Sequence, residues 1–251
     1  MATQYGMRRT FTSDTERRVI AFYDIGVCST DVAVVSISGA DLKMLAIESD
    51  HRLGGRDFDE LLVVKLAEDI KQRYKLDVWT NTRAVLKLRK ECDRLKQVLS
   101  ANTSAPYTIE YLMNDTDVKG VVTREEFEAL IKDNFRDRLL APLERAVKAA
   151  NTSLDQLHSL ELLGGGTRVP YVQSLIRAVF GREVSKTCDA DESVCWGATL
   201  HCAMLVPQFK VKPYEVQVRS YRLSVNARLE RITLSKLCEM KLKHNKWYYS
   251  S

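Results

Sequence analysis

The sequence of 251 residues lacks the features that mark membrane-spanning and exported proteins. It contains no run of about 18 apolar residues, so we expect no membrane-spanning helix. The first residues, Met1 to Arg9, have no apolar core of the kind that secretory signal peptides carry. We therefore expect a cytoplasmic protein.

Paired metal ligands and clustered catalytic groups are missing as well. The six cysteines form no C-x-x-C pair, which argues against a zinc site and favours a reducing compartment. Most of them lie in apolar patterns, where a free cysteine behaves as a small core residue. The four histidines are scattered and suggest no catalytic arrangement. We expect no catalytic residue and no metal ion held by the protein itself.

The net charge of +5 comes from the C-terminal part of the chain. Residues 207–251 contain ten Lys and Arg against three Asp and Glu, whereas the remainder is nearly neutral. A basic tail can bind nucleic acid or an acidic membrane, but many such tails are simply solvated. Since no recognition motif accompanies the charge, we expect no membrane partner and regard nucleic acid as an unlikely one.

Local patterns predict strands and then helices in the first half of the chain. Three strands joined by short turns are expected within residues 19–48. The glycine pair Gly54-Gly55 precedes a helix for which Asp57 is the expected cap. A second helix is expected over Thr82–Ser100, followed by a short strand over Tyr107–Leu112.

The second half alternates differently. A capping box at Thr123 begins a helical region that reaches Ala150, with Pro142 within it or after its first part. A strand over residues 157–163, a glycine turn and an amphipathic helix ended by Gly181 follow. The last helix is expected from Asp191 to Leu205. This order favours an α/β domain with a helical-plus-β insertion.

The most informative stretch runs from Gly164 to Pro170, with the sequence GGGTRVP. It connects a predicted strand to a predicted helix. Glycine at such a turn lets the backbone approach a ligand, and the helix start points N–H groups at it. A nucleotide or a phosphate suits such a turn. Tight packing of the strand on the helix accounts for the glycines equally well at this point.

Two further patterns suit the same kind of ligand. Asp24-Ile25-Gly26 ends a strand, where a carboxylate can approach a phosphate-bound metal, although an ordinary hairpin turn has the same pattern. The second predicted helix carries a polar stripe of Arg89, Asp93, Lys96 and Ser100. Such a stripe presents hydrogen-bonding groups either to a ligand or to solvent.

Five motifs, taken in order, resemble the second lobe of the nucleotide-binding domain of Hsp70-type chaperones over roughly residues 3–216. They are Asp24-Ile25-Gly26, Leu53 to Asp59, Glu91 to Lys96, Gly164 to Pro170, and Asp189 to Val194 with the following Gly197. Within that family the chain is most similar to the Hsp110 branch, through Tyr74 to Asp77 and Tyr111 to Asp115.

The resemblance implies an actin-like ATPase fold of the ribonuclease H-like type. Residues 1–52 and 123–206 would form one lobe, subdomain IIA. Residues 53–122 would form the inserted helical-plus-β subdomain IIB. Residues 207–251 would be a linker and a divergent basic tail.

The resemblance also implies a site for ATP or ADP, with magnesium held only through the nucleotide. Asp24 would face the metal and phosphates, and Gly26 the phosphates. The adenosine pocket would be formed by Asp93, Lys96, Ser100 and Gln97 on one wall, by Gly165, Gly166 and Arg168 on the other, and by Asp191 at its edge. Gln97 stands where typical Hsp70 proteins have an arginine that stacks on the base.

Two departures from the family pattern bear on activity. The loop reads Gly26-Val27-Cys28-Ser29, where a typical Hsp70 has a glycine-rich phosphate loop. The motifs of the first lobe are not found in these 251 residues. Because phosphoryl transfer needs groups from both lobes, we expect weak nucleotide binding and little ATP hydrolysis.

The leading hypothesis is an ATP-binding, heat-shock-type chaperone of the Hsp110/Hsp70 kind. In intact form it would assist the folding of unfolded client proteins and promote nucleotide exchange on an Hsp70 partner. The alternative is an interaction module that docks on an Hsp70 and binds no nucleotide, which Val27 and Cys28 in the loop favour.

Overall fold

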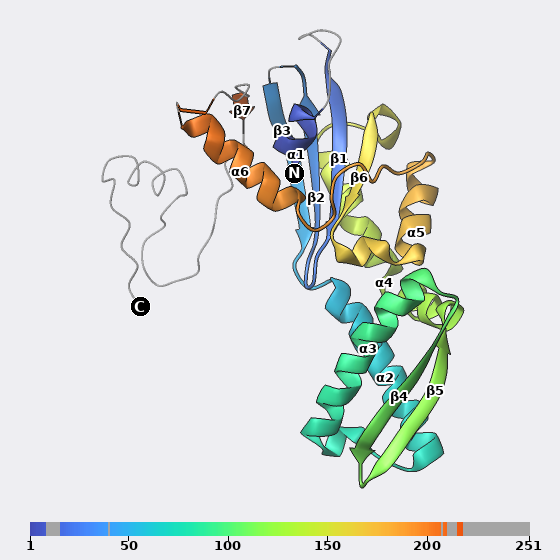
Figure 1. The fold of residues 1–251 in the computed structure, drawn as a ribbon. Coiled ribbons are helices and arrows are strands. Elements are labelled where there is room, and N and C mark those ends of the chain that lie inside the picture. The colour runs from blue at the N-terminus through green and yellow to red at the C-terminus, as the bar shows by residue number, and fades with distance from the viewer. Residues whose placement is uncertain (9–15, 40, 207, 210–214, 218–251) are drawn as a thin grey trace, which may run out of the picture.

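The computed structural model describes residues 1–8, 16–39, 41–206, 208–209 and 215–217. These residues form two units that lie end to end (Figure 1). One unit is built on a five-stranded sheet, and the other consists of two long helices and a β-hairpin.

The sheet has the strand order β6-β1-β2-β3-β7. β1 (Arg18–Ile25), β2 (Thr30–Ile37) and β3 (Asp41–Asp50) form an antiparallel meander, which confirms the three strands predicted there. β6 (Ser159–Leu163) pairs parallel with β1, and the short β7 (Glu215–Gln217) pairs parallel with β3. β1 therefore lies inside the sheet, between β6 and β2, and its side chains are buried on both faces of the sheet.

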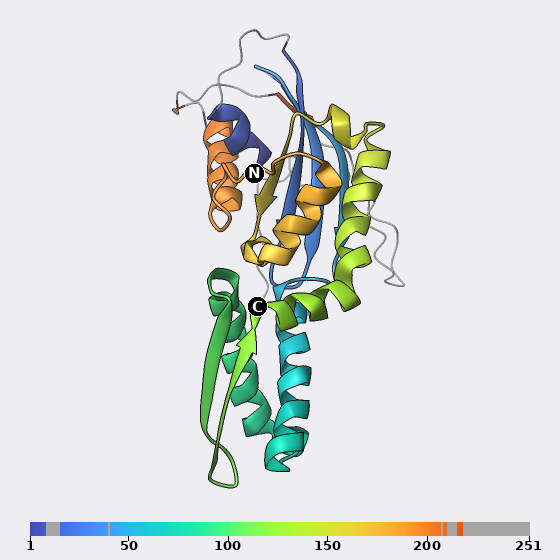
Figure 2. The same ribbon diagram turned by 90° about the vertical axis from the view of Figure 1, so that its right-hand side faces the viewer.

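Helices cover both faces of this sheet (Figure 2). α4 (Arg124–Ala149) and α5 (Pro170–Phe180) pack on the face to which Tyr23 belongs. α1 (Ala2–Met7), a helix that was not predicted, packs on the other face beside α6 (Ser193–Leu205). A Cβ atom at Gly197 of α6 would come within 2.6 Å of the Met1 nitrogen, so this glycine serves close helix packing.

α4 is a single helix that contains Pro142, and it is visibly bent (Figure 2). Proline has no N–H group to donate to the carbonyl four residues earlier, which accounts for a bend. The Tyr23 hydroxyl donates to the Leu139 carbonyl oxygen at 2.6 Å and ties this part of the helix to β1. The N-terminal part of α4 also contacts the second unit, through an ion pair of Glu126 with Lys65 at 3.5 Å.

The second unit contains α2 (Gly55–Tyr74), α3 (Thr82–Ala101), and the hairpin of β4 (Ser104–Met113) and β5 (Thr116–Thr123). The apolar stripe of α3 is buried against α2 and β4. Short 3₁₀ turns lie at Val78–Thr80, Leu154–Gln156 and Gly165–Arg168. Both predicted helices are confirmed, β4 is longer than predicted, and β5 was missed.

Three local predictions were wrong. Asp57 is not the N-cap of α2: its carboxylate accepts the Gly54 N–H at 2.8 Å from inside the first turn. α6 begins at Ser193, so Asp191 lies before the helix rather than in it. Of the five described cysteines only Cys92 is buried, whereas three are exposed and one is half-buried. The expected linker and basic tail, residues 207–251, lie largely outside the described residues.

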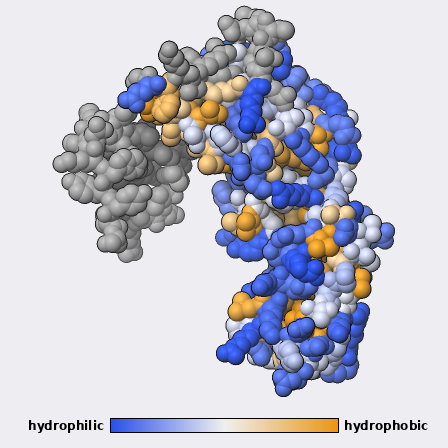
Figure 3. Space-filling view, in the orientation of Figure 1, coloured by the Kyte–Doolittle hydropathy of each residue, from blue (hydrophilic) through white to orange (hydrophobic). Residues whose placement is uncertain are grey.

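α6 carries exposed apolar side chains (Figure 3). The exposed fractions are 56% for Val194, 48% for Trp196 and 72% for Leu205. Within the described parts of the chain, no helix combines the length and the apolar character needed to cross a bilayer.

Candidate functional site

A cavity of about 770 Å³ lies where the two units meet. Its walls come from five segments: the loop after β1, the start of α2, the C-terminal half of α3, the turn between β6 and α5, and the segment before α6. Nine of the ten residues that the resemblance implies line it, namely Gly26, Asp93, Lys96, Gln97, Ser100, Gly165, Gly166, Arg168 and Asp191. The tenth, Asp24, does not.

The glycine turn contains two glycines that are needed for close packing and one that borders open space. Gly164 has a φ of 76°, and a Cβ atom there would overlap the Ile25 carbonyl and the Asp24 carboxylate. A Cβ atom at Gly166 would overlap the Ile25 side chain. Gly165 differs, because a Cβ atom there would meet no atom within 4 Å. The two explanations offered by the sequence therefore apply to different glycines.

Asp24 lies at the end of β1, directly opposite Asp31 of β2. Burial raises the pKa of the Asp24 carboxyl, and the nearby Asp31 raises it further, while the Met1 amino group acts in the opposite direction. Asp31 accepts hydrogen bonds from the Ser29 and Ser49 hydroxyls at 2.7 and 2.5 Å. Asp31 was not predicted as a site residue, although the register of the β1–β2 hairpin places it across from Asp24.

The loop after β1 is attached to the first turn of α2. The backbone N–H groups of Gly55 and Arg56 donate to the carbonyl oxygens of Gly26 and Val27, at 2.9 and 2.8 Å. Gly54 makes this close approach feasible, because a Cβ atom there would lie 2.6 Å from the backbone of the loop. The glycine pair thus brings α2 to the rim of the cavity.

Lys96 is the central polar residue of the α3 wall. Its ammonium group donates to Asp59 Oδ2 at 2.7 Å and to the Gly55 carbonyl at 3.3 Å, and it lies 3.2 Å from Asp93 Oδ1. Burial raises the pKa of the Asp59 carboxyl, although Lys96 acts in the opposite direction. Asp59 Oδ1 is buried and has no hydrogen-bond partner in the part of the chain that the structure describes.

The other polar residues of α3 near Lys96 divide into two groups. Gln97 donates to Asp93 Oδ2 at 3.2 Å, and the Ser100 hydroxyl donates to the Lys96 carbonyl at 2.9 Å, so both stay within the cavity wall. Arg89 instead pairs with Glu60 at 3.0 Å and does not line the cavity.

The opposite edge of the cavity is formed by an ion pair of Arg168 with Asp191, 2.5 Å apart and mostly exposed to solvent. Asp189 holds the segment before α6 in place, because its carboxylate accepts the N–H groups of Glu192 and Asp191 at 2.7 and 2.8 Å. These bonds to the backbone lower the pKa of Asp189.

Five lining residues were not predicted as site residues: Val27, Gly55, Arg56, Asp59 and Val169. All five are neighbours of predicted ones or belong to the motifs that carried the resemblance. Asp59 follows Gly55 by four residues and therefore lies on the same face of α2. This spacing is the signal in the sequence from which Asp59 could have been predicted as a site residue.

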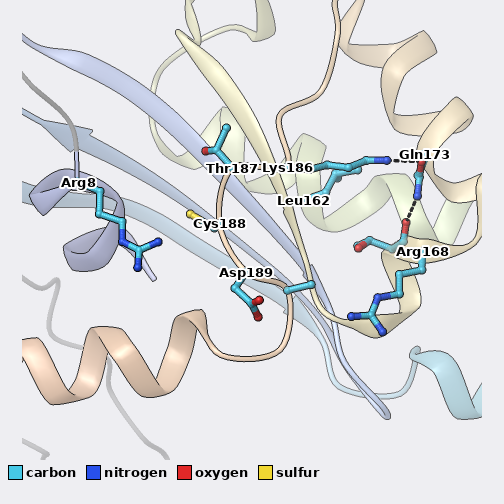
Figure 4. Close-up of a pocket in the computed structure, with 10 residues that line it drawn as sticks. Arg8, Leu162, Arg168, Gln173, Lys186, Thr187, Cys188 and Asp189 are labelled. Carbon is cyan, nitrogen blue, oxygen red and sulfur yellow. Dashed lines mark hydrogen bonds between the residues drawn. The ribbon is translucent and has the colours of Figure 1, made fainter.

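A second, more open cavity of about 630 Å³ shares Arg168 with the first (Figure 4). Two of its polar side chains, Lys186 and Gln173, bind each other. Lys186 donates to the Gln173 side-chain oxygen at 2.6 Å, and the Gln173 amide donates to the Thr167 carbonyl at 2.8 Å. No group of His, Cys, Asp and Glu side chains suited to a metal ion occurs within the described ranges.

Comparisons with known proteins agree with the resemblance. The model of the Hsp70 protein family matches residues 1–234, which extends beyond residue 216. The chain is 42% identical over 217 residues to Heat shock 70 kDa protein 16 of Arabidopsis thaliana, covering 86% of this chain and 28% of that protein. It is 40% identical to Heat shock protein 88 of Dictyostelium discoideum, covering 90% and 29%.

A third relative, the 97 kDa heat shock protein of Strongylocentrotus purpuratus, is 41% identical, with 82% of this chain and 23% of the relative covered. The chain thus spans less than a third of the length of each of these relatives. Its mixed sheet with helices on both faces is consistent with the actin-like ATPase fold of their family. The chain belongs to the Hsp70 family of heat-shock chaperones.

Proposed function

We propose that this chain is an adenine-nucleotide-binding lobe of an Hsp110/Hsp70-type chaperone and that ATP or ADP binds in the 770 Å³ cavity. One observation carries the proposal. Nine residues that the resemblance implies, from positions as distant in sequence as Gly26 and Asp191, line a single cavity.

The chemistry of the walls suits such a ligand. Ammonium, carboxylate and hydroxyl groups on α3 match the hydroxyls of a ribose and the polar edge of a base. The open space at Gly165 leaves room for a flat ring. The phosphates would lie toward Gly26 and Asp24, and magnesium would enter with them.

In the intact protein, this lobe would serve a cytoplasmic chaperone that assists unfolded clients and promotes nucleotide exchange on an Hsp70 partner. The support is membership of the family and the names of the relatives, which are heat shock proteins.

Isothermal titration calorimetry of the 251-residue chain with ADP tests the proposal. We expect a dissociation constant weaker than micromolar, further weakened by Lys96→Ala and by Gly165→Val. The valine fills the cavity without disturbing its neighbours, since the space at Gly165 is open. Arg89→Ala is the matched control, because Arg89 lies on α3 outside the cavity. Submicromolar affinity, or binding unchanged by Lys96→Ala and Gly165→Val, contradicts the proposal.

The alternative, an interaction module without nucleotide, is favoured by the exposed apolar side chains of the second unit. Trp79, Leu86, Tyr111 and Val121 are between 50% and 66% exposed. This alternative predicts binding to a purified Hsp70 that Tyr111→Asp abolishes, together with no heat of binding for ADP.

A further inference from the structure

We propose that Arg56 binds the phosphate groups of the nucleotide and thereby makes the cavity favour nucleotides over uncharged nucleosides. The inference rests on the proposed function. It concerns a residue to which neither the polar stripe nor the glycine turn had pointed.

The charges of the cavity single out this arginine. Three acidic and three basic residues line it: Asp59, Asp93, Asp191, Arg56, Lys96 and Arg168. Lys96 pairs with both Asp59 and Asp93, and Arg168 pairs with Asp191. The Arg56 side chain has no ion pair or hydrogen bond with any residue that the structure describes. Its guanidinium therefore keeps all five N–H donors for a ligand.

The backbone beside Arg56 does not compete for that role. The N–H groups of Gly55 and Arg56 already donate to the carbonyl oxygens of Gly26 and Val27. The N–H group of Gly54 donates to the Asp57 carboxylate. The first turn of α2 thus offers no free N–H group at these positions to an anion. The cation that remains at this end of the cavity is the Arg56 side chain.

The two ends of the cavity differ in charge. On the α3 side, the single charge of Lys96 is shared between Asp59 and Asp93, which leaves an excess of negative charge. That side suits hydroxyl donors and repels phosphate. On the loop side, Arg56 and the neighbouring Val27 form a wall with a free positive charge. A nucleotide matches this polarity when its ribose lies toward α3 and its phosphates toward Arg56.

Arginine also suits the ligand geometrically, because its planar guanidinium forms paired hydrogen bonds with phosphate oxygens. The side chain is exposed, so solvent screens its charge. We therefore expect a moderate contribution: loss of Arg56 should weaken ADP binding about fivefold, the scale of one exposed charge interaction.

The experiment compares ADP with adenosine on the full 251-residue chain, by calorimetry or competition. Arg56→Gln should raise the dissociation constant for ADP about fivefold and leave that for adenosine unchanged. Arg56→Lys keeps the charge and should restore most of the ADP affinity. Arg73→Gln is the matched control, since Arg73 is an exposed arginine on the same helix away from the cavity. It should change neither affinity.

The outcomes separate this inference from the proposed function. If the unmodified chain binds neither ligand, the proposed function fails. If it binds ADP and Arg56→Gln has no effect, or weakens ADP and adenosine equally, the assignment of Arg56 is overturned. Raising the salt concentration should weaken ADP binding to the unmodified chain more than to Arg56→Gln. Equal salt dependence also counts against the assignment.

Discussion

Replacing Asp59 with asparagine should weaken nucleotide binding through Lys96. Asp59 Oδ2 lies 2.7 Å from the Lys96 ammonium, and the two side chains are only 18% and 17% exposed. When residue 59 is neutral, Lys96 still has its ion pair with Asp93 at 3.2 Å. The Asp93 side chain is 55% exposed, so this ion pair orders the lysine side chain less than the pair with Asp59 does. Lys96 must then be ordered when the ligand binds, which costs up to about 2 kcal/mol of side-chain entropy. We therefore expect the dissociation constant for ADP to rise about tenfold, corresponding to ~1.4 kcal/mol.

The same substitution should change fold stability only modestly. At an effective dielectric constant of about 20, unit charges 4 Å apart attract by about 4 kcal/mol, but burying each ion costs several kcal/mol. Asp59 Oδ1 is also buried without a partner among the described residues, and asparagine removes the charge from that site. These terms largely cancel, so we expect the free energy of unfolding to fall by only about 1–2 kcal/mol.

A double-mutant cycle distinguishes positioning from general damage. If Asp59 acts only through Lys96, the double variant Asp59→Asn/Lys96→Met should bind ADP as Lys96→Met does. Glu60→Gln is the control, because it breaks the Arg89–Glu60 pair, which also joins α2 to α3 but lies outside the cavity. Equal losses for Asp59→Asn and Glu60→Gln, or additive losses in the double variant, would refute the reasoning.

Four further predictions concern stability, pH, catalysis and association. Gly54→Ala should lower the free energy of unfolding by about 2 kcal/mol in urea titrations, because a Cβ atom there lies 2.6 Å from loop backbone, whereas Gly165→Ala should be neutral; equal effects would contradict this. The pKa of Asp24 is raised above 3.8, so the favourable contribution of its carboxyl to the free energy of unfolding is fully present below pH 3.8 and is lost as the pH rises through the raised pKa. The melting temperature of Asp24→Asn should therefore rise relative to that of the unmodified chain between pH 4 and 7. A difference in melting temperature that stays constant over this range would argue against it. In a phosphate-release assay the purified chain should show no ATP turnover above background, because phosphoryl transfer needs groups from both lobes; turnover that Asp24→Asn abolishes would contradict this expectation. The chain should associate in light scattering because α6 exposes apolar side chains, among them Trp196, and a monomer both with and without residues 220–251 would count against this.

Local patterns sufficed for much of the fold. The alternation within residues 19–48 and the glycine turn before α5 are short-range signals, and the structure contains the corresponding strands and helix. β5 was missed because only Val118 and Val122 among its residues are buried. The stronger signal was the turn, since Asn114 and Asp115 both have positive φ, as two-residue hairpin turns of type I′ require.

Tertiary contacts explain what the sequence could not provide about the site. Asp93, Lys96 and Arg89 share one stripe of α3, yet Arg89 lies about 10 Å along the axis from Lys96 and faces Glu60 instead. Asp59 is absent from the prediction because its contact with Lys96 requires α2 and α3 to pack against each other. A tertiary contact also explains why α6 begins at Ser193 rather than at the predicted Asp191. Asp191 forms an ion pair with Arg168 of the glycine turn instead of stabilising a helix N-terminus.

Amide hydrogen exchange with and without ADP tests the central claim most directly, because it reports where the ligand binds. If the nucleotide occupies the cavity, ADP should slow exchange in the segments that line it, residues 91–101 of α3 and 163–169 of the glycine turn. Exchange in the β4–β5 hairpin, residues 104–123, should stay unchanged. Slowed exchange confined to that hairpin, or none in either lining segment at saturating ADP, would contradict the assignment.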